Sequence, residues 1–159
     1  MISRRTFLIT SSALGVVCAF GGTALAQVPF EVRHTTAEWR KILSEDAYMV
    51  MRQGDTEPPG YSPLDQEKRA GIFSCAGCDL PLFSSDTKFD SGTGWPSFWQ
   101  PLDNAIGRTE DRTYGMTRIE VHCRRCGGHL GHVFEDGPRP TGLRYCMNGV
   151  AMKFDPSGG

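Results

Sequence analysis

The chain has 159 residues, of which 39% are hydrophobic and 22% charged, and this composition indicates one folded globular domain rather than a disordered chain. The first 26 residues hold only Arg4 and Arg5 as charged residues, which leaves 15 of the 17 basic residues and all 18 acidic residues beyond them. This slightly acidic balance excludes a broad electrostatic attraction to nucleic acid or to anionic membranes.

The first 26 residues have the pattern of an export signal. Residues 3–8 contain Arg4 and Arg5 and resemble the twin-arginine motif, an apolar run follows over residues 9–20, and residues 24–26 form a small-x-small cleavage site. The alternative is a retained membrane anchor, but the apolar run is interrupted by polar residues and is shorter than the ~20 residues that a bilayer span needs. We therefore expect residues 1–26 to be a cleaved signal peptide, residues 27–159 to be a single domain, and the mature protein to be periplasmic.

The next segment, residues 35–53, is predicted to be helical. Thr35 and Glu38 have the spacing of a capping box, in which each side chain bonds the backbone of the other residue. Ser44 can cap a second short helix, and Gly54 can end it. Residues 56–63 are rich in proline and glycine, which predicts a loop.

From Gly71 onward the pattern changes to that of β-structure. Residues 116–122 alternate between apolar and polar, and Val150, Met152 and Phe154 alternate in the same way. Short apolar runs at residues 72–73, 82–83 and 133–134 are bounded by Gly, Asp or Pro. We expect a small antiparallel β-domain preceded by a helical segment.

Four of the six cysteines form two CxxC pairs, which we call the first knuckle (Cys75 and Cys78) and the second knuckle (Cys123 and Cys126). Two knuckles complete a tetrahedral site with four sulfur ligands, which suits zinc and leaves no open position for catalysis. The alternatives are two disulfides, which export permits, iron in the same geometry, or a redox motif, which needs a βαβ context that is absent here. We predict one structural zinc ion.

Cys146 is the one cysteine of the predicted mature chain outside the knuckles. A thiolate is the nucleophilic form of cysteine, and the nearby Arg144 favours the charged form. The alternative is a buried structural cysteine, which is common among free thiols.

Two histidines, His129 and His132, follow the second knuckle directly. Positions three apart on a strand face opposite sides, so either the chain bends at Gly131 or only one histidine shares the pocket of a reactive group. The alternatives are further metal ligands or hydrogen-bonded core histidines. Residues 92–99 form a loop dense in aromatic side chains, which either covers the core or forms a wall for an apolar ligand group.

Three blocks together, SGTGWPSFWQP, CRRCGGHLGHVFEDGP and RYCMN, resemble the type B methionine sulfoxide reductase family. The resemblance runs from about residue 36 to residue 154 and includes both knuckles. It implies a mainly β fold of two antiparallel sheets with short N-terminal helices, and a structural zinc site away from the active site. It also implies reduction of the R epimer of methionine sulfoxide, free or in oxidised proteins, as part of the repair of oxidative damage.

The resemblance also assigns roles to individual residues. It implies that Cys146 is the nucleophile and ends the reaction as a sulfenic acid. It further implies that His129 and His132 bind and protonate the sulfoxide oxygen, that Arg144 supports the thiolate and that Asn148 lies in the same pocket. Trp95 and Phe98 would enclose the substrate methyl group, and Asp136 would orient a histidine.

The chain departs from the family pattern at Thr93, where many members carry a resolving cysteine. We therefore expect an external thiol or a thioredoxin-like donor to recycle Cys146 in a monomeric protein. A non-catalytic, zinc-binding, chaperone-like module is the alternative function. It explains the knuckles but not Cys146, the two histidines or the aromatic loop. A general thiol oxidoreductase would need a second free cysteine.

Overall fold

The computed structural model describes residues 30–157, apart from the side chain of Tyr114. The predicted signal peptide and its cleavage site lie outside the described residues. None of the helices within residues 30–157 is both long and apolar enough to cross a membrane.

Two short helices open the described chain, α1 (Thr36–Ile42) and α2 (Glu45–Gln53). Thr35 and Glu38 form the predicted capping box, and the Ser44 hydroxyl accepts a hydrogen bond from the backbone of α2. Gly54 ends α2 in the left-handed conformation, with φ of 72°. The predicted helical segment and both of its helix starts are therefore confirmed.

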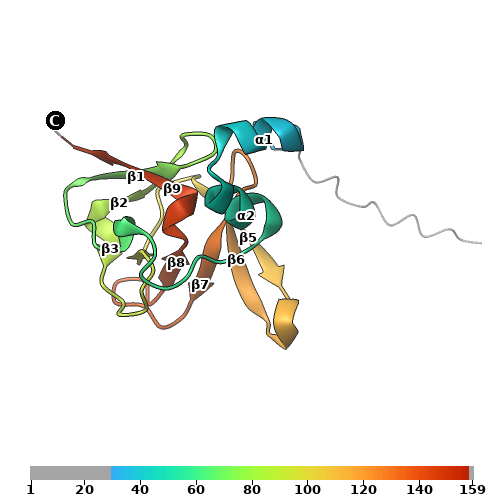
Figure 1. Ribbon diagram of the computed structural model, residues 1–159. Coiled ribbons are helices and arrows are strands. Elements are labelled where there is room, and N and C mark those ends of the chain that lie inside the picture. Colours follow the sequence, from blue (N-terminus) through green and yellow to red (C-terminus); the bar gives the residue numbers. More distant parts are fainter. Residues whose placement is uncertain (1–29, 158–159) are drawn as a thin grey trace, which may run out of the picture.

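The strands form two antiparallel sheets, as predicted, and Figure 1 shows the smaller one at the end where the chain finishes. The small sheet has the order β2-β1-β9, and the large sheet has the order β3-β4-β8-β7-β6-β5. Four 3-10 turns lie in the described chain: η1 (Pro63–Asp65) before β1, η2 (Ser85–Thr87) between β2 and β3, η3 (Thr113–Gly115) between β5 and β6, and η4 (Gly149–Ala151) between β8 and β9. The strands are β1 (Gly71–Cys75), β2 (Pro81–Ser84), β3 (Lys88–Phe89), β4 (Ser97–Phe98), β5 (Ile106–Asp111), β6 (Arg118–Cys123), β7 (His129–Phe134), β8 (Arg144–Met147) and β9 (Met152–Pro156).

The last strand begins later than the alternation of Val150, Met152 and Phe154 predicts. Val150 lies in η4, and β9 starts at Met152. The cause is the carboxylate of Glu57, which accepts hydrogen bonds from the backbone N–H groups of Gly149 (2.7 Å) and Val150 (2.9 Å). These donors are therefore not available to a strand ladder.

Aromatic side chains from both sheets fill the core. Phe83 of β2 stacks on Phe98 of β4 with ring centroids 4.3 Å apart, and Phe73 of β1 contacts Phe98 edge-on at 4.9 Å. These three rings and Tyr145 of β8 are almost completely buried. The core therefore lies between the sheets, while α2 packs against β7 and η4.

Candidate active site and metal centre

The four knuckle cysteines converge on one point. Their sulfur atoms all lie within 4.8 Å of one another, with Cys75 Sγ 3.7 Å from Cys126 Sγ and Cys78 Sγ 3.6 Å from Cys123 Sγ. A tetrahedral zinc ion with bonds of about 2.3 Å places its sulfur ligands about 3.8 Å apart, whereas a disulfide needs about 2.05 Å. The geometry therefore fits a metal ion held by four thiolates.

The four-cysteine cluster joins the two sheets, because Cys75 ends β1 and Cys123 ends β6. Arg52 of α2 adds a positive charge there: both terminal nitrogens lie 3.1 Å from the Cys126 carbonyl oxygen, and one lies 3.3 Å from Cys126 Sγ. The guanidinium also lies 4.0 Å from the centre of the Trp39 ring. A divalent metal with four thiolates carries two negative charges, so this arginine is electrostatically favourable and fixes α2 to the second knuckle.

The candidate nucleophile occupies the middle of the large sheet. Cys146 lies on β8, directly opposite Ser97 of β4 on one side and His132 of β7 on the other. The strands β7 and β8 approach closely at Gly131, where a Cβ atom would lie 2.1 Å from the carbonyl oxygen of Cys146. The sheet itself therefore places an imidazole next to the thiol.

A β-bulge at Leu130 brings the two histidines together. Val121 pairs with Gly131 and His122 pairs with His129, so β7 holds one extra residue, Leu130. The rings of His129 and His132 consequently lie 5.3 Å apart between centroids. The chain therefore bends, as one of the two alternatives drawn from the sequence expects, but only His132 lines the cavity beside Cys146, as the other expects.

A cavity of about 170 Å³ opens beside Cys146. Four predicted site residues line it: Cys146, His132, Asn148 and Trp95. His129 lies instead in an adjoining groove that shares His132 with the cavity. The other lining residues are Gly131, which the sequence singled out as a possible bend, and Thr56, Arg118 and Phe134, to which the sequence assigned no role.

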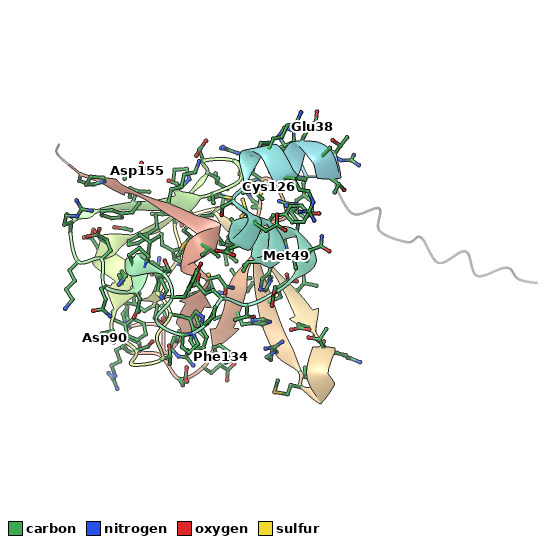
Figure 2. The ribbon with its side chains drawn as sticks, viewed as in Figure 1. Glu38, Met49, Asp90, Cys126, Phe134 and Asp155 are labelled. Carbon is green, nitrogen blue, oxygen red and sulfur yellow. The ribbon has the colours of Figure 1, made fainter. Side chains whose placement is uncertain are left out.

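The prediction that Phe98 faces the substrate is contradicted by its position. Successive residues of a strand point to opposite faces, so Ser97 shares the face of Cys146 while Phe98 is completely buried in the core. Phe134 stands with Trp95 on the cavity wall in its place. Figure 2 shows Phe134 far from Cys126, so this cavity is separate from the metal centre, as the family resemblance implies.

The prediction that Asp136 orients a histidine is also wrong. Its carboxylate accepts two hydrogen bonds from Arg144, at 2.9 Å and 2.8 Å. Arg144 lies 4.6 Å above the centre of the Phe134 ring, so Asp136 fixes one side of the cavity through Arg144. The histidines have other partners that sequence analysis missed: Glu120 for His129 (2.7 Å) and Asp111 for His132 (2.8 Å).

Glu57 is a further residue that sequence analysis missed, because nothing marks a buried carboxylate within a Pro/Gly-rich loop. Besides its bonds to η4, its backbone N–H donates to the side-chain oxygen of Asn148 (3.0 Å). Its carbonyl oxygen accepts from the indole of Trp95 (3.0 Å). This loop residue therefore positions two residues of the cavity wall.

Comparison with known proteins identifies the domain. A model of the SelR domain family matches residues 43–156. The chain belongs to the SelR family. Both knuckles and every residue that lines the cavity lie within the matched segment, and the family resemblance drawn from the sequence is confirmed.

Several relatives of this SelR domain carry the name peptide methionine sulfoxide reductase MsrB. The protein of that name from Pseudomonas putida (strain W619) is 52% identical over 81% of this chain and 98% of its own length. The protein from Agrobacterium fabrum is 50% identical, covering 79% of this chain and 94% of its own length. The protein from Methanosarcina barkeri is 52% identical, covering 77% and 87%. Among solved structures, the Mis18 "Yippee-like" domain overlaps 57% of this chain and all of its own, with a TM-score of 0.47 and 17% identity.

Electrostatics in the cavity of the SelR domain act on Cys146 in two directions. Burial raises the pKa of the Cys146 thiol, while the charge of Arg144 and hydrogen bonds from Thr93 and Arg144 oppose that rise. Arg144 thus acts in the predicted direction, but burial outweighs it. Thr93, at the position of the resolving cysteine in many family members, lies within reach of the candidate nucleophile.

The two histidines differ in their surroundings. Burial lowers the pKa of His132, and the hydrogen bond to Asp111 partly opposes this effect. The pKa of Glu120 is lowered chiefly by its hydrogen bond to His129. The site therefore combines a shielded thiol, a buried imidazole with a carboxylate behind it, and a second imidazole in the outer groove.

Proposed function

We propose that this protein is a methionine-R-sulfoxide reductase, which reduces the R epimer of methionine sulfoxide in oxidised proteins or as the free amino acid. The observation that carries the proposal is the pairing of Cys146 with His132 across β7 and β8, inside an aromatic-walled cavity of a SelR domain. The name shared by relatives that are about half identical supports the same reaction.

The proposed reaction needs a nucleophile and a proton. The thiolate of Cys146 attacks the sulfoxide sulfur while the sulfoxide oxygen takes a proton, because an unprotonated oxide is a poor leaving group. His132 is the nearest imidazole and supplies this proton, with His129 behind it as the second imidazole. As the S–O bond of the substrate breaks, the oxygen forms a new bond to the Cys146 sulfur and the transient S–S bond breaks, so methionine leaves reduced by two electrons and Cys146 becomes a sulfenic acid, oxidised by two.

The walls of the cavity support a choice of epimer. Trp95 and Phe134 form an apolar surface for the methyl group, a role that the sequence assigned to Trp95 and Phe98. His132 presents a polar group in the same cavity, while the side-chain amide of Asn148 is bonded to the backbone of Glu57 and Leu130, so the methyl and oxygen positions of the sulfoxide are distinguished.

Recycling of Cys146 is proposed to use an external thiol, from a small molecule or a thioredoxin-like donor. Thr93 offers no sulfur, and the four knuckle cysteines lie together in a cluster that fits a metal ion. An external thiol attacks the sulfenic sulfur, forms a mixed disulfide and releases water, and a second thiol then frees Cys146.

We also propose that the metal is zinc, held by Cys75, Cys78, Cys123 and Cys126, and that the monomeric protein is exported by the twin-arginine signal of residues 1–26. The four-sulfur donor set favours zinc. Replacing Arg4 and Arg5 by lysine should leave the precursor inside the cell. Unchanged recovery from the periplasm would refute the export route.

The activity is tested with purified residues 27–159, resolved R- and S-sulfoxides and dithiothreitol. The wild type should reduce only the R epimer, and Cys146→Ser should reduce neither while keeping its metal and its circular dichroism. Turnover by Cys146→Ser would refute the assignment of the nucleophile. A wild-type protein that reduces neither epimer would favour the non-catalytic zinc module, which gives no reason for the pairing of Cys146 with His132.

The recycling step is tested by a single turnover without reductant. We expect a gain of one oxygen on the Cys146 peptide, which dimedone traps. A disulfide between Cys146 and a knuckle cysteine, with release of the metal, would refute the external route.

A further inference from the structure

The hairpin of β5 and β6, which extends from the body of the molecule in Figure 1, holds a carboxylate against His132. Asp111 Oδ2 lies 2.8 Å from His132 Nε2 and 2.7 Å from a terminal nitrogen of Arg118. Asp111 Oδ1 accepts from the backbone N–H (2.9 Å) and the hydroxyl (2.7 Å) of Thr113. Asp111 is therefore fixed from three directions, and its side chain is only 13% exposed.

This contact decides which nitrogen of His132 carries a hydrogen. The Asp111 carboxylate is an acceptor, because its hydrogen bonds to Thr113 hold its pKa well below the usual range. His132 must then donate from Nε2–H, which leaves Nδ1 as the nitrogen that can serve the cavity. In His129 the opposite nitrogen, Nδ1, is engaged by Glu120.

We propose that Asp111 is a positioning residue, which holds His132 with Nε2–H on its carboxylate and Nδ1 toward Cys146, and which stabilises the imidazolium form. The inference rests on the proposed function, because it assigns the proton donor of that reaction. It concerns Asp111, which lies at the end of β5 and outside all three sequence blocks. A carboxylate bonded to the far nitrogen of a catalytic imidazole fixes the tautomer of the ring and stabilises its positively charged form.

The charged and titratable groups around His132 come from every neighbouring element. Burial lowers the pKa of His132, Arg118 and His129 lower it further, and Asp111 raises it. Removal of the Asp111 charge should therefore lower this pKa again. The groups are Asp111 and Glu110 of β5, Arg112 of the hairpin tip, Arg118 and Glu120 of β6, His129 of β7, Cys146 of β8 and Asp55 of the loop after α2.

The first test is the pH dependence of turnover in Asp111→Asn relative to wild type. The opposite charge of Asp111 in contact favours the imidazolium form of His132, and Arg118 shares the same carboxylate, so loss of that charge lowers the pKa of His132. The ratio of variant to wild-type kcat should therefore fall to about one tenth above the pKa of His132. It should approach one only as the pH falls below the lower pKa of His132 in the variant, because both proteins then hold the imidazolium.

Two variants separate this effect from a general defect. Asp111→Glu should recover part of the lost activity, because it restores the charge. Glu45→Gln removes an exposed carboxylate that pairs with Arg40 on the helical segment, outside the cavity and its groove, and its ratio to wild type should be close to one at all pH values. A ratio for Asp111→Asn that is equally low at every pH would mean a merely structural role and would overturn the proposal.

The second test needs neither a variant nor turnover. Nitrogen-15 NMR of the histidines in the wild-type protein should show neutral His132 as the Nε2–H tautomer. Finding the Nδ1–H tautomer would overturn the inference even if the protein reduces the R-sulfoxide. Conversely, an inactive wild type with the Nε2–H tautomer would refute the proposed function while leaving the Asp111 contact established.

Discussion

Gly131→Ala should displace the two strands that carry the nucleophile and the proton donor. The new Cβ would lie 2.1 Å from the carbonyl oxygen of Cys146 and 3.0 Å from the Cα of Met147, where ordinary contacts begin at 3.4 Å. Both obstructing atoms belong to the backbone, so β7 and β8 must separate by more than 1 Å. We expect a loss of about 3 kcal/mol in the free energy of unfolding, because overpacking of a rigid site costs about that much.

Gly142→Ala is the matched control. Gly142 has φ of 72° and no atom within 4 Å of the Cβ position, so the substitution introduces backbone strain without a collision. Its expected cost is about 1–2 kcal/mol. Gly131 also has a positive φ, of 154°, so the difference between the two variants reports the collision.

The assays are urea unfolding of both variants and their turnover of the R-sulfoxide. The free energies of unfolding are compared only if the dependence of the free energy on urea concentration is the same in both variants. A displacement of about 1 Å between reacting groups can reduce the rate about 100-fold, so Gly131→Ala should lose most of its activity and Gly142→Ala should keep it. If Gly131→Ala is as stable and active as Gly142→Ala, the close approach of β7 and β8 is wrong.

Three further predictions address the cavity wall, the thiol and the metal. Trp95→Leu should reduce kcat/KM by at least tenfold with little loss of stability, because Trp95 lines the cavity. Phe98→Leu should instead lower the free energy of unfolding by about 1–3 kcal/mol with little change in kcat/KM, because Phe98 is buried in the core. Steady-state kinetics and urea unfolding measure the two effects. Because burial raises the pKa of Cys146, the rate of its alkylation should reach half its maximum at a pH above the value of about 8.5 expected for a free thiol. Arg144→Met should move this midpoint to a still higher pH, because it removes the charge that favours the thiolate. A wild-type midpoint below a pH of about 8.5 would contradict this account. Cys123→Ser should lose the metal, which elemental analysis would report, and should unfold at lower urea concentration because metal binding contributes to folding; a metal-free variant as stable as wild type would argue against the site.

Local signals in the sequence predict the elements well, because the contacts that make them are local. The capping box of Thr35 and Glu38 spans four residues, and each knuckle is a single turn. The family resemblance also predicts Cys146, His132 and Trp95 as neighbours, and all three line one cavity.

The missed residues depend on contacts between distant segments. Asp111 and Glu120 reach the histidines only through the pairing of β5, β6 and β7 and the bulge at Leu130, and the sequence gives no direct measure of that register. Phe98 was misplaced for a related reason. The strand β4 has only two residues, so its sequence shows no alternation of apolar and polar side chains. The pairing of β4 with β8 decides which of the two residues points to the core.

The bulge at Leu130 has a consequence for the spacing of the two histidines. With a spacing of two, both imidazoles would share one face of a regular strand, and the single residue between them would point the other way. The spacing of three instead accommodates both a completely buried leucine, which packs into the core, and a glycine thin enough to let β8 approach. Deletion of one residue between His129 and His132 would keep both imidazoles on one face of the strand. It would, however, remove either the buried leucine or the glycine at which β8 approaches. The length of this two-residue segment is therefore constrained, although the segment lies in a sheet next to the cavity.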